Sequence, residues 1–262
     1  MRDLIISLPP VAIAAVLFAV FLAVSFGARR LVRRRFSEDV REELSEQATN
    51  LLTGISATFA FFIGFAISIS WGAVTAGQNA VEQQAAAIHQ MAWEIRNIPD
   101  STASAALMEK LKAYASTAAG QDDDLLARGE TTNLPSAAVL ESFEDSLTAY
   151  VYGPGSGVKG APNLLTTASN LVSSAAAVSA VANRSLPRPL AALLFVVGVV
   201  VTVILGITTV TSGRSSTIFI YIWCLIPALS LTVVLALAFP FALRSGMTTA
   251  PLRAVAQSLD GR

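Results

Sequence analysis

The sequence contains few charged residues and almost none of the side chains that build metal sites or disulfides. Only 14% of its 262 residues are charged, whereas soluble domains carry about 25%, so the composition indicates a polytopic membrane protein. The single cysteine, Cys224, excludes an intrachain disulfide and a thiolate metal cluster. The single histidine, His89, cannot form a histidine-ligand site by itself. The net formal charge is zero, and this balance predicts no nucleic acid partner.

Sequence motifs of common enzyme classes are missing as well. The chain has no nucleophile elbow, phosphate-binding loop or HExxH motif. Three consecutive carboxylates, Asp122 to Asp124, offer oxygen ligands to a divalent cation. They lack the alternating ligand spacing of a calcium loop, however, so a solvated acidic loop is the favoured interpretation. The sequence therefore predicts no enzyme, no cofactor and no metal site.

The longest uncharged stretch runs from Gln47 to Val81. A helix needs about 20 apolar residues to cross the hydrocarbon core of a bilayer, so this stretch predicts a membrane span. Every fourth residue along it is small, and residues four apart share one helical face. This small-residue stripe consists of Ser56, Ala60, Gly64, Ser68, Gly72 and Ala76. Small residues let membrane helices approach closely, which predicts a packing face. The alternative is a chance arrangement of residues that are common in any membrane helix.

Three further apolar runs predict three further spans. The first covers Leu8–Phe26, the third Leu190–Val210 and the fourth Thr217–Leu243. The third span repeats the small pattern, which adds Gly198 and Gly206 to the expected packing residues. None of the four spans contains an acidic or basic side chain. Proton relays and charge-coupled transporters usually carry such residues within the membrane, so neither class is favoured.

The predicted fold is all-α, because no segment shows the alternating pattern of a β-strand. We expect four transmembrane helices and a helical extramembrane domain between the second and third. Within that domain we expect Ser101 to cap a helix and Gln121–Pro135 to form a loop. The expected parts are residues 1–50, a first span and an Arg-rich linker with a short helix after Ser37; residues 51–98, a second span that continues as a stalk; residues 99–188, the helical extramembrane region; residues 189–243, a hairpin of spans three and four; and residues 244–262, a tail.

The distribution of positive charge bears on orientation. The densest cluster, Arg29 to Arg35, lies in a short loop next to the first span. Positive charge in short loops favours the cytoplasmic side, so it places residues 29–50 in the cytoplasm. The opposite orientation would gather Arg184, Arg188, Arg244 and Arg253 there instead.

The run from Gly64 to Ile88 resembles the signature of the bestrophin-like family of bacterial membrane proteins, distant relatives of the bestrophin anion channels. The matching positions are Gly64, Trp71, Ala80, Val81, Glu82, Ala85, Ala87 and Ile88. The order of parts also matches, with two spans, a polar helical region and two more spans. Family members usually carry an aromatic residue and charged side chains just after the tryptophan, where this chain has Gly72, Ala73, Val74 and Gln78.

The resemblance implies an oligomeric channel for inorganic ions, with a pentamer as the expected homo-oligomer in the lipid of a bacterial plasma membrane. It also implies an anion pathway in which the second span lines a hydrophobic neck, with Phe59, Ile63 and Ile67 as the candidate constriction. A ring of apolar side chains can gate a pore by dewetting. The alternative interpretation of these three residues is that they are ordinary core or lipid-facing residues. The resemblance places the region between the middle spans in the cytosol, opposite to the charge argument.

The alternative function is a non-conducting membrane scaffold or sensor whose helical domain binds a partner or ligand.

Overall fold

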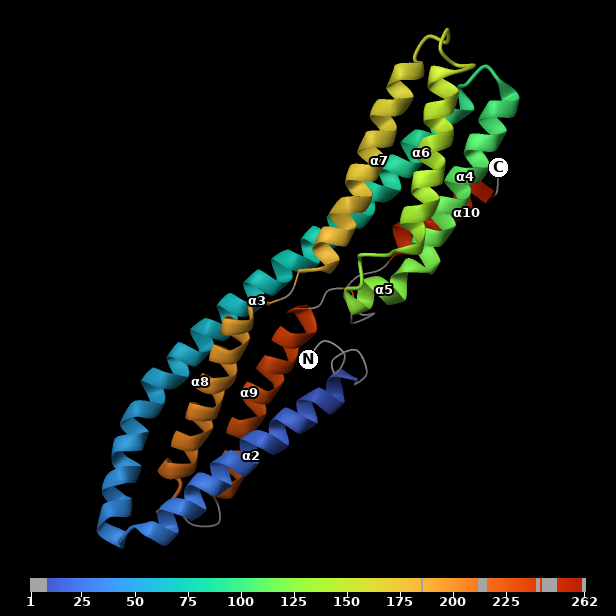
Figure 1. Ribbon diagram of the computed structural model, residues 1–262. Helices are drawn as coiled ribbons and strands as arrows, with labels where there is room; N and C mark the ends of the chain where they lie inside the picture. Colours follow the sequence, from blue (N-terminus) through green and yellow to red (C-terminus); the bar gives the residue numbers. More distant parts are fainter. Residues whose placement is uncertain (1–8, 185, 212–215, 239–240, 242–248, 261–262) are drawn as a thin grey trace. The chain divides into compact units, whose positions relative to one another are not determined.

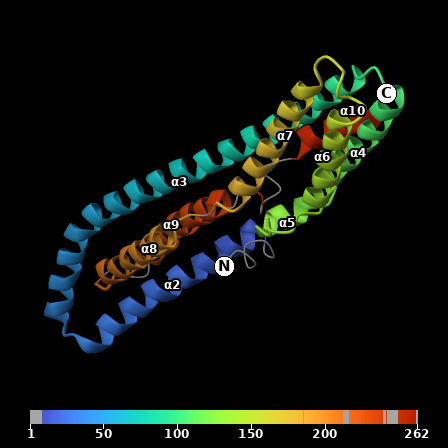
Figure 2. The same ribbon diagram turned by 45° about the horizontal axis from the view of Figure 1, so that its top comes forward.

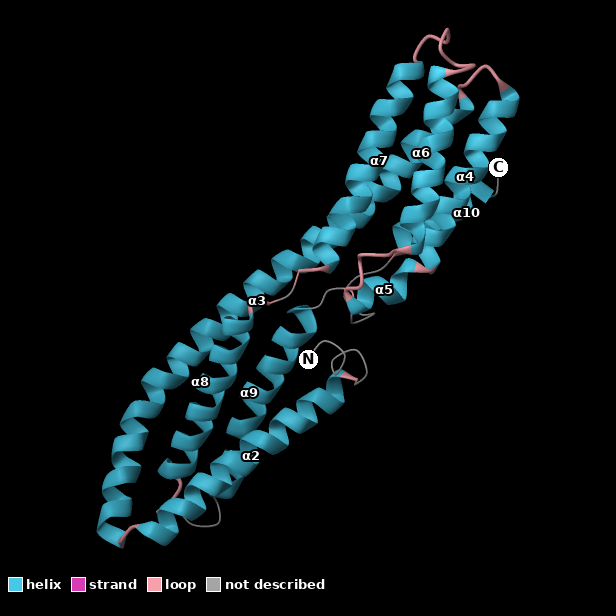
Figure 3. Cartoon of the chain, viewed as in Figure 1, coloured by secondary structure: helices cyan, strands magenta, loops and turns pink. Residues whose placement is uncertain are grey.

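The helices of the protein follow the apolar runs of the sequence and in places extend well beyond them. A computed structural model describes residues 9–184, 186–211, 216–238, 241 and 249–260. The described residues contain helices and connecting loops and no strand (Figure 3). The chain divides into two compact units: unit 1 comprises residues 1–72 and 185–238, and unit 2 comprises residues 73–184 and 239–262.

Unit 1 is built from four helical segments that carry the apolar runs. They are α2 (Pro10–Arg35), the first part of α3 (Glu38–Arg96), α8 (Arg188–Thr208) and α9 (Ser216–Ala238). Helix α2 packs against both α8 and α9, and α8 packs against α9 (Figure 1, Figure 2). Phe21 of α2, Leu194 of α8 and Ile220 of α9 are almost completely buried in this unit. Proline residues are expected to kink or end the fourth span at positions 227 and 240. Pro227 lies inside α9, whereas Pro240 lies outside the described residues.

Both N-terminal helices of unit 1 are longer than the apolar runs predict. Helix α2 continues past Phe26 through the arginine cluster, whose positive charge suits the C-terminal end of the helix dipole. The short helix expected after Ser37 is not a separate element, because the polar residues from Glu38 onward belong to α3. No glycine or proline occurs between Glu38 and Thr53, so nothing in the sequence interrupts that helix. Two side chains of these helices form hydrogen bonds at the C-terminal end of α8. Arg33 donates to the carbonyl of Val210, just after α8, at 2.9 and 3.1 Å, and Ser45 donates to the Thr208 carbonyl at 2.8 Å.

Unit 2 is a bundle of helices around a buried apolar core. Its elements are the second part of α3, α4 (Ser101–Gly120), α5 (Asp122–Arg128), α6 (Pro135–Tyr152), α7 (Ala161–Ala182) and α10 (Ala250–Asp260). Helix α4 packs against α6 and α10, and α6 packs against α7. The largest fully buried side chains include Ile88, Met91, Leu111, Tyr114, Phe143 and Leu171. The stalk part of α3 therefore belongs to the core of this bundle.

Two local predictions in unit 2 are wrong. The segment expected to be a loop from Gln121 to Pro135 begins with the helix α5. Its three aspartates occupy the first helical turn, where negative charge suits the helix dipole. The cap of α4 is Asp100 rather than Ser101, because the Asp100 carboxylate accepts from the amides of Thr102 and Ala103 at 2.9 and 3.1 Å. Both residue types favour helix N-caps, so sequence alone does not separate two adjacent candidates.

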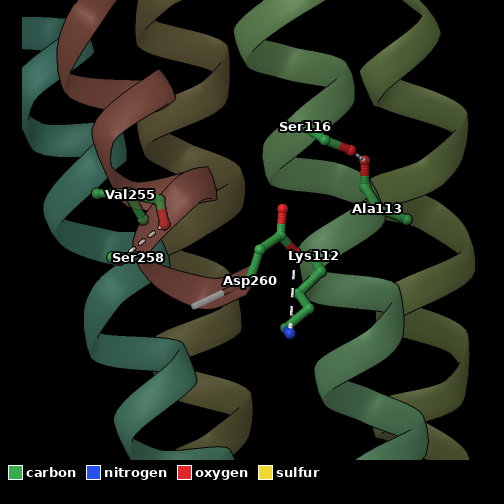
Figure 4. A network of polar contacts seen from close by, with 6 residues as sticks. All are labelled: Lys112, Ala113, Ser116, Val255, Ser258 and Asp260. Atoms are coloured by element: carbon green, nitrogen blue, oxygen red, sulfur yellow. Dashed lines mark hydrogen bonds and ion pairs between the residues drawn. The ribbon is translucent and has the colours of Figure 1, made fainter. Parts of the chain in front are cut away.

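The last described helix, α10, lies against α4 through an apolar face. Leu252 and Leu259 are buried there. Polar contacts frame this face: Lys112 lies 3.8 Å from Asp260 (Figure 4), and Arg253 lies 3.2 Å from Asp123. Arg253 also donates to the carbonyl of Ala119 near the end of α4 at 3.4 Å. Exposed ion pairs contribute about 0–1 kcal/mol, so the leucines supply most of the attachment.

Asp122 connects α5 to the start of α6. The side chain is 3% exposed, and its Oδ1 accepts from the amide of Ser136 at 3.2 Å. The residue before α6, Leu134, makes no side-chain cap. Asp122 therefore supplies the acceptor for the Ser136 amide, which has no partner within the first turn of the helix. Burial raises the pKa of the Asp122 carboxyl, and the hydrogen bonds from Ser136 partly offset that rise.

Replacing Asp122 with alanine is expected to destabilise unit 2 by about 1 kcal/mol, the usual effect of removing a cap acceptor. Asp122→Asn keeps an oxygen acceptor and should be milder.

Because burial raises the pKa of Asp122 in the folded state, its ionisation reduces stability as the pH rises through that pKa. The stability of Asp122→Asn relative to wild type should therefore improve between pH 4 and pH 7. Thermal unfolding of the full chain in detergent, followed by circular dichroism at both values, measures this difference. A pH-independent difference would contradict the assignment.

Candidate functional site

The first part of α3 presents two contrasting faces, and one of them is buried within unit 1. Phe59 is 6% exposed and Ile63 is 8% exposed, while Ile67 is half-buried. The ring of Phe59 lies close to Gly198 of α8. A pore-lining side chain must face open space, so this burial favours a packing role for Phe59 and Ile63.

The small-residue stripe lies beside this buried row, on the exposed side of α3. Ala60, Gly64, Ser68 and Gly72 are exposed, and Ser56 and Ala76 are half-buried. A Cβ atom added at Gly64 or Gly72 would meet no atom of the described chain within 4 Å. Within one copy of the chain, these two glycines therefore line open surface rather than a helix contact.

A bulky row runs beside the small stripe on the exposed face. Phe61 is 70% exposed, Phe65 is 52% exposed, and Ile69 is also exposed. These residues are four apart and therefore follow one another along the helix. The neck residues predicted from the sequence, Phe59, Ile63 and Ile67, form the row on the other side of the stripe. The four-residue spacing of Phe61, Phe65 and Ile69 was available as a signal, but it does not show which row is covered by other helices.

The two glycines of α8 lie where the helices of unit 1 approach closely. A Cβ atom at Gly198 would come within 3.2 Å of the Phe21 ring and 3.5 Å of the Phe59 ring. A Cβ atom at Gly206 would clash with the backbone carbonyl oxygen of Ser25 and lie 3.1 Å from the Ala28 side chain. Helix α8 thus contacts α2 closely through Gly206 and contacts both α2 and α3 around Gly198.

The exposed face of α3 is uncharged over a long distance. From Gln47 to Val81 the sequence contains no acidic or basic side chain, so this face is formed by apolar, small, hydroxyl and amide residues. Such a surface on a long helix is suited to lipid or to other helices.

The described helices include five that are long and apolar enough to cross a membrane: α2, α3, α7, residues 189–208 of α8 and residues 217–238 of α9. Together with the all-helical fold, they define an integral membrane protein. A sequence model of the Bestrophin-like domain matches residues 16–248. The chain belongs to the Bestrophin-like family.

Solved structures support the same fold. A bacterial Bestrophin homolog from Klebsiella pneumoniae, solved by Zn-SAD phasing, is similar with a TM-score of 0.67 and 15% identity, over 94% of this chain and 95% of the other. A point mutant of the Klebsiella pneumoniae homolog gives a TM-score of 0.69 and 14% identity, over 94% and 97% of the two chains. A third structure, described as a membrane protein, is similar with a TM-score of 0.70 and 14% identity, over 94% of this chain and 96% of the other. No curated protein sequence matches this chain.

Proposed function

We propose that the protein is a homo-oligomeric ion channel of the plasma membrane in which copies of α3 surround a central axis. The exposed small stripe is the observation that carries this proposal. In lipid, helices associate through close backbone approach along small residues, because the hydrophobic effect does not drive them together. The centre of the stripe is open, because a Cβ atom added at Gly64 or Gly72 would contact no other helix of the described chain within 4 Å, so a second copy is the partner that would use it. A pentamer is the assembly that the family resemblance implies.

Four segments would cross the membrane: α2, the first part of α3, α8 and α9. The fifth apolar helix, α7, would stay outside the membrane as part of unit 2. It packs against α6 and α5, and Thr167 donates to the Glu94 carboxylate at 2.7 Å. Its sequence also contains many hydroxyl residues, including Thr166, Ser173 and Ser174. These features are typical of a helix in a polar bundle.

The neck of the channel would be lined by Phe61 and Phe65 rather than by Phe59 and Ile63. Phe61 and Phe65 are exposed beside the small stripe, so helix packing along that stripe would turn them toward the space between subunits. Rings of phenylalanine side chains form an apolar constriction that can exclude water and ions until it widens. Ile69 extends the same row by one turn.

Conduction of anions is supported by the chemistry of this face and by the family. Cation channels commonly use rings of aspartate or glutamate, and no such residue occurs from Gln47 to Val81. An axis lined by α3 would therefore present no acidic ring within the membrane. Chloride is the natural first ion to measure.

Shortening the neck residues is expected to increase ion flux. Phe61→Ala and Phe65→Ala should each raise chloride flux severalfold in liposomes containing the purified protein, because a wider neck is easier to hydrate. Phe59→Ala is the matched control, since it removes the same side chain from a buried site. It should instead destabilise the fold by about 3–5 kcal/mol. Chloride-dependent fluorescence quenching measures the flux.

The absence of any ion flux from a well-folded oligomer would contradict the channel proposal. A monomer or dimer without flux would favour the scaffold or sensor alternative, in which the membrane helices only anchor unit 2. Size-exclusion chromatography with light scattering distinguishes these assemblies before the flux is measured.

A further inference from the structure

Unit 2 contains a cavity that the channel proposal does not use. It has a volume of about 270 Å³ and lies among α4, α5, α6, α7, α10 and the second part of α3. Most of its wall consists of alanine, valine and leucine side chains. Small-molecule sites typically measure about 300–1,000 Å³ and combine apolar walls with a few polar groups. This cavity is near the lower end of that range.

The polar groups that line the cavity are predominantly hydrogen-bond acceptors. They come from Gln84, Asp122, Ser136, Glu144 and Ser179. Gln84 is 4% exposed; its Nε2 donates to the Tyr114 hydroxyl at 2.6 Å, and its Oε1 has no hydrogen-bond partner among the described atoms. Asp122 already accepts from the Ser136 amide. A buried acceptor without a partner costs free energy, which a ligand that donates a hydrogen bond would recover.

The titratable groups that line the cavity are acidic. Two carboxylates, Asp122 and Glu144, line it, and none of the described lining residues is a lysine, arginine or histidine. Burial raises the pKa of Glu144, and the neighbouring Asp145 and Glu141 raise it further. A positive charge beside Glu144 would favour the ionised carboxylate and so lower its pKa, opposite to the effects of burial and of the neighbouring acids.

Nearby basic residues are engaged elsewhere. Arg253, which follows the lining residue Leu252, contacts Asp123 and the Ala119 carbonyl. Lys110 donates to the carbonyl and hydroxyl oxygens of Ser142 at 3.1 and 2.9 Å. The two carboxyl groups of the cavity are thus not paired with a basic residue of the described wall.

We propose that this cavity binds a small organic cation, with one ammonium group beside Glu144 and an apolar body of about four or five carbons against the leucine and valine walls. An ammonium group donates up to three hydrogen bonds and accepts none, which complements a wall of acceptors. A bare metal ion is a poorer fit, because the described residues contain no group of three His, Cys, Asp or Glu side chains placed to hold one. The proposal does not depend on the chain conducting ions.

The test measures binding of isopentylammonium to the purified full chain in detergent, by calorimetry and by the shift in thermal unfolding. Isopentanol and isovalerate are the matched probes with the same carbon skeleton and neutral or negative charge. Isopentylammonium should bind and raise the unfolding midpoint, and each matched probe should bind about tenfold more weakly or not at all. Equal binding of the amine and the alcohol, or no binding of the amine, would overturn the proposal.

Two variants locate the ammonium group. Glu144→Gln removes the carboxylate that lines the cavity and should weaken isopentylammonium binding about tenfold. Glu141→Gln makes the same change on an exposed position of α6 outside the cavity wall, and should change binding less than twofold. Ala175→Leu, which fills the cavity from α7, should abolish binding in a chain that remains folded by circular dichroism. Equal losses in Glu144→Gln and Glu141→Gln would reduce the effect to overall charge and contradict the site.

Discussion

Gly206→Ala is expected to lower the thermal unfolding midpoint of the protein by roughly 6–12 °C. The added Cβ atom would clash with the backbone carbonyl oxygen of Ser25 and crowd Ala28. A backbone atom within a helix cannot rotate away, so α2 and α8 would have to separate along their contact. Overpacking typically costs about 1–3 kcal/mol, and the rigid partner places this case near or above 3 kcal/mol. At about 2–4 °C per kcal/mol for a chain of this size, that gives the stated shift.

The other glycines of unit 1 supply a graded control. At Gly198, the nearest atoms belong to the rings of Phe21 and Phe59, which can move by a few tenths of an ångström. Gly198→Ala should therefore cost less than Gly206→Ala. Gly27 of α2 has no described atom within 4 Å of the added Cβ, so Gly27→Ala should leave the midpoint unchanged or raise it slightly. Circular dichroism in one detergent measures all three variants. An equal response at Gly206 and Gly27 would show that α2 and α8 do not approach as described.

Gly64→Leu is expected to dissociate the oligomer and remove ion flux while each chain stays folded. The substitution adds a bulky side chain to an exposed stripe, where a Cβ atom meets nothing of the described chain. Its effect on the isolated fold should therefore be small. Helices that pack through small residues approach closely, so a leucine at the centre of the stripe would hold them apart. The mass measured by light scattering should fall to that of one chain, 27.4 kDa plus bound detergent.

Gly27→Leu is the matched control for this experiment. It makes the same substitution at an exposed glycine of a predicted membrane helix outside the stripe, again with open space around the added Cβ. Its oligomer and its chloride flux should match those of wild type. If Gly64→Leu retained the wild-type mass and flux, the stripe would not be the contact between subunits. If both variants dissociated, the effect would belong to added bulk in general rather than to the stripe.

Much of the helical organisation follows from the sequence because its signals are local. Apolar runs without charge predict the helices of unit 1, and the absence of alternating patterns predicts an all-helical fold. Pro135 is the first residue of α6 and Gly120 is the last residue of α4, in keeping with the preference of proline for helix starts and of glycine for helix ends. These signals operate through backbone conformation and hydrophobicity, which neighbouring residues determine largely by themselves.

The remaining features depend on contacts between residues far apart in the chain. The start of α6 is capped by Asp122 of α5, which lies 14 positions before Ser136. No local sequence motif indicates this hydrogen bond. The cavity of unit 2 draws its polar groups from α3, α5, α6 and α7. Spacing along one helix cannot bring Gln84 and Glu144 to the same cavity.

The sequence by itself determined that residues 47–81 form a long uncharged stretch with a stripe of small residues beside a bulky row. Only the tertiary structure decided which row is covered: Phe59 and Ile63 are buried, while Phe61 and Phe65 remain exposed. The physical reason is that both rows consist of large apolar residues with the same four-residue spacing. Their difference arises from α8, whose Gly198 leaves room for the Phe59 ring on one side of α3.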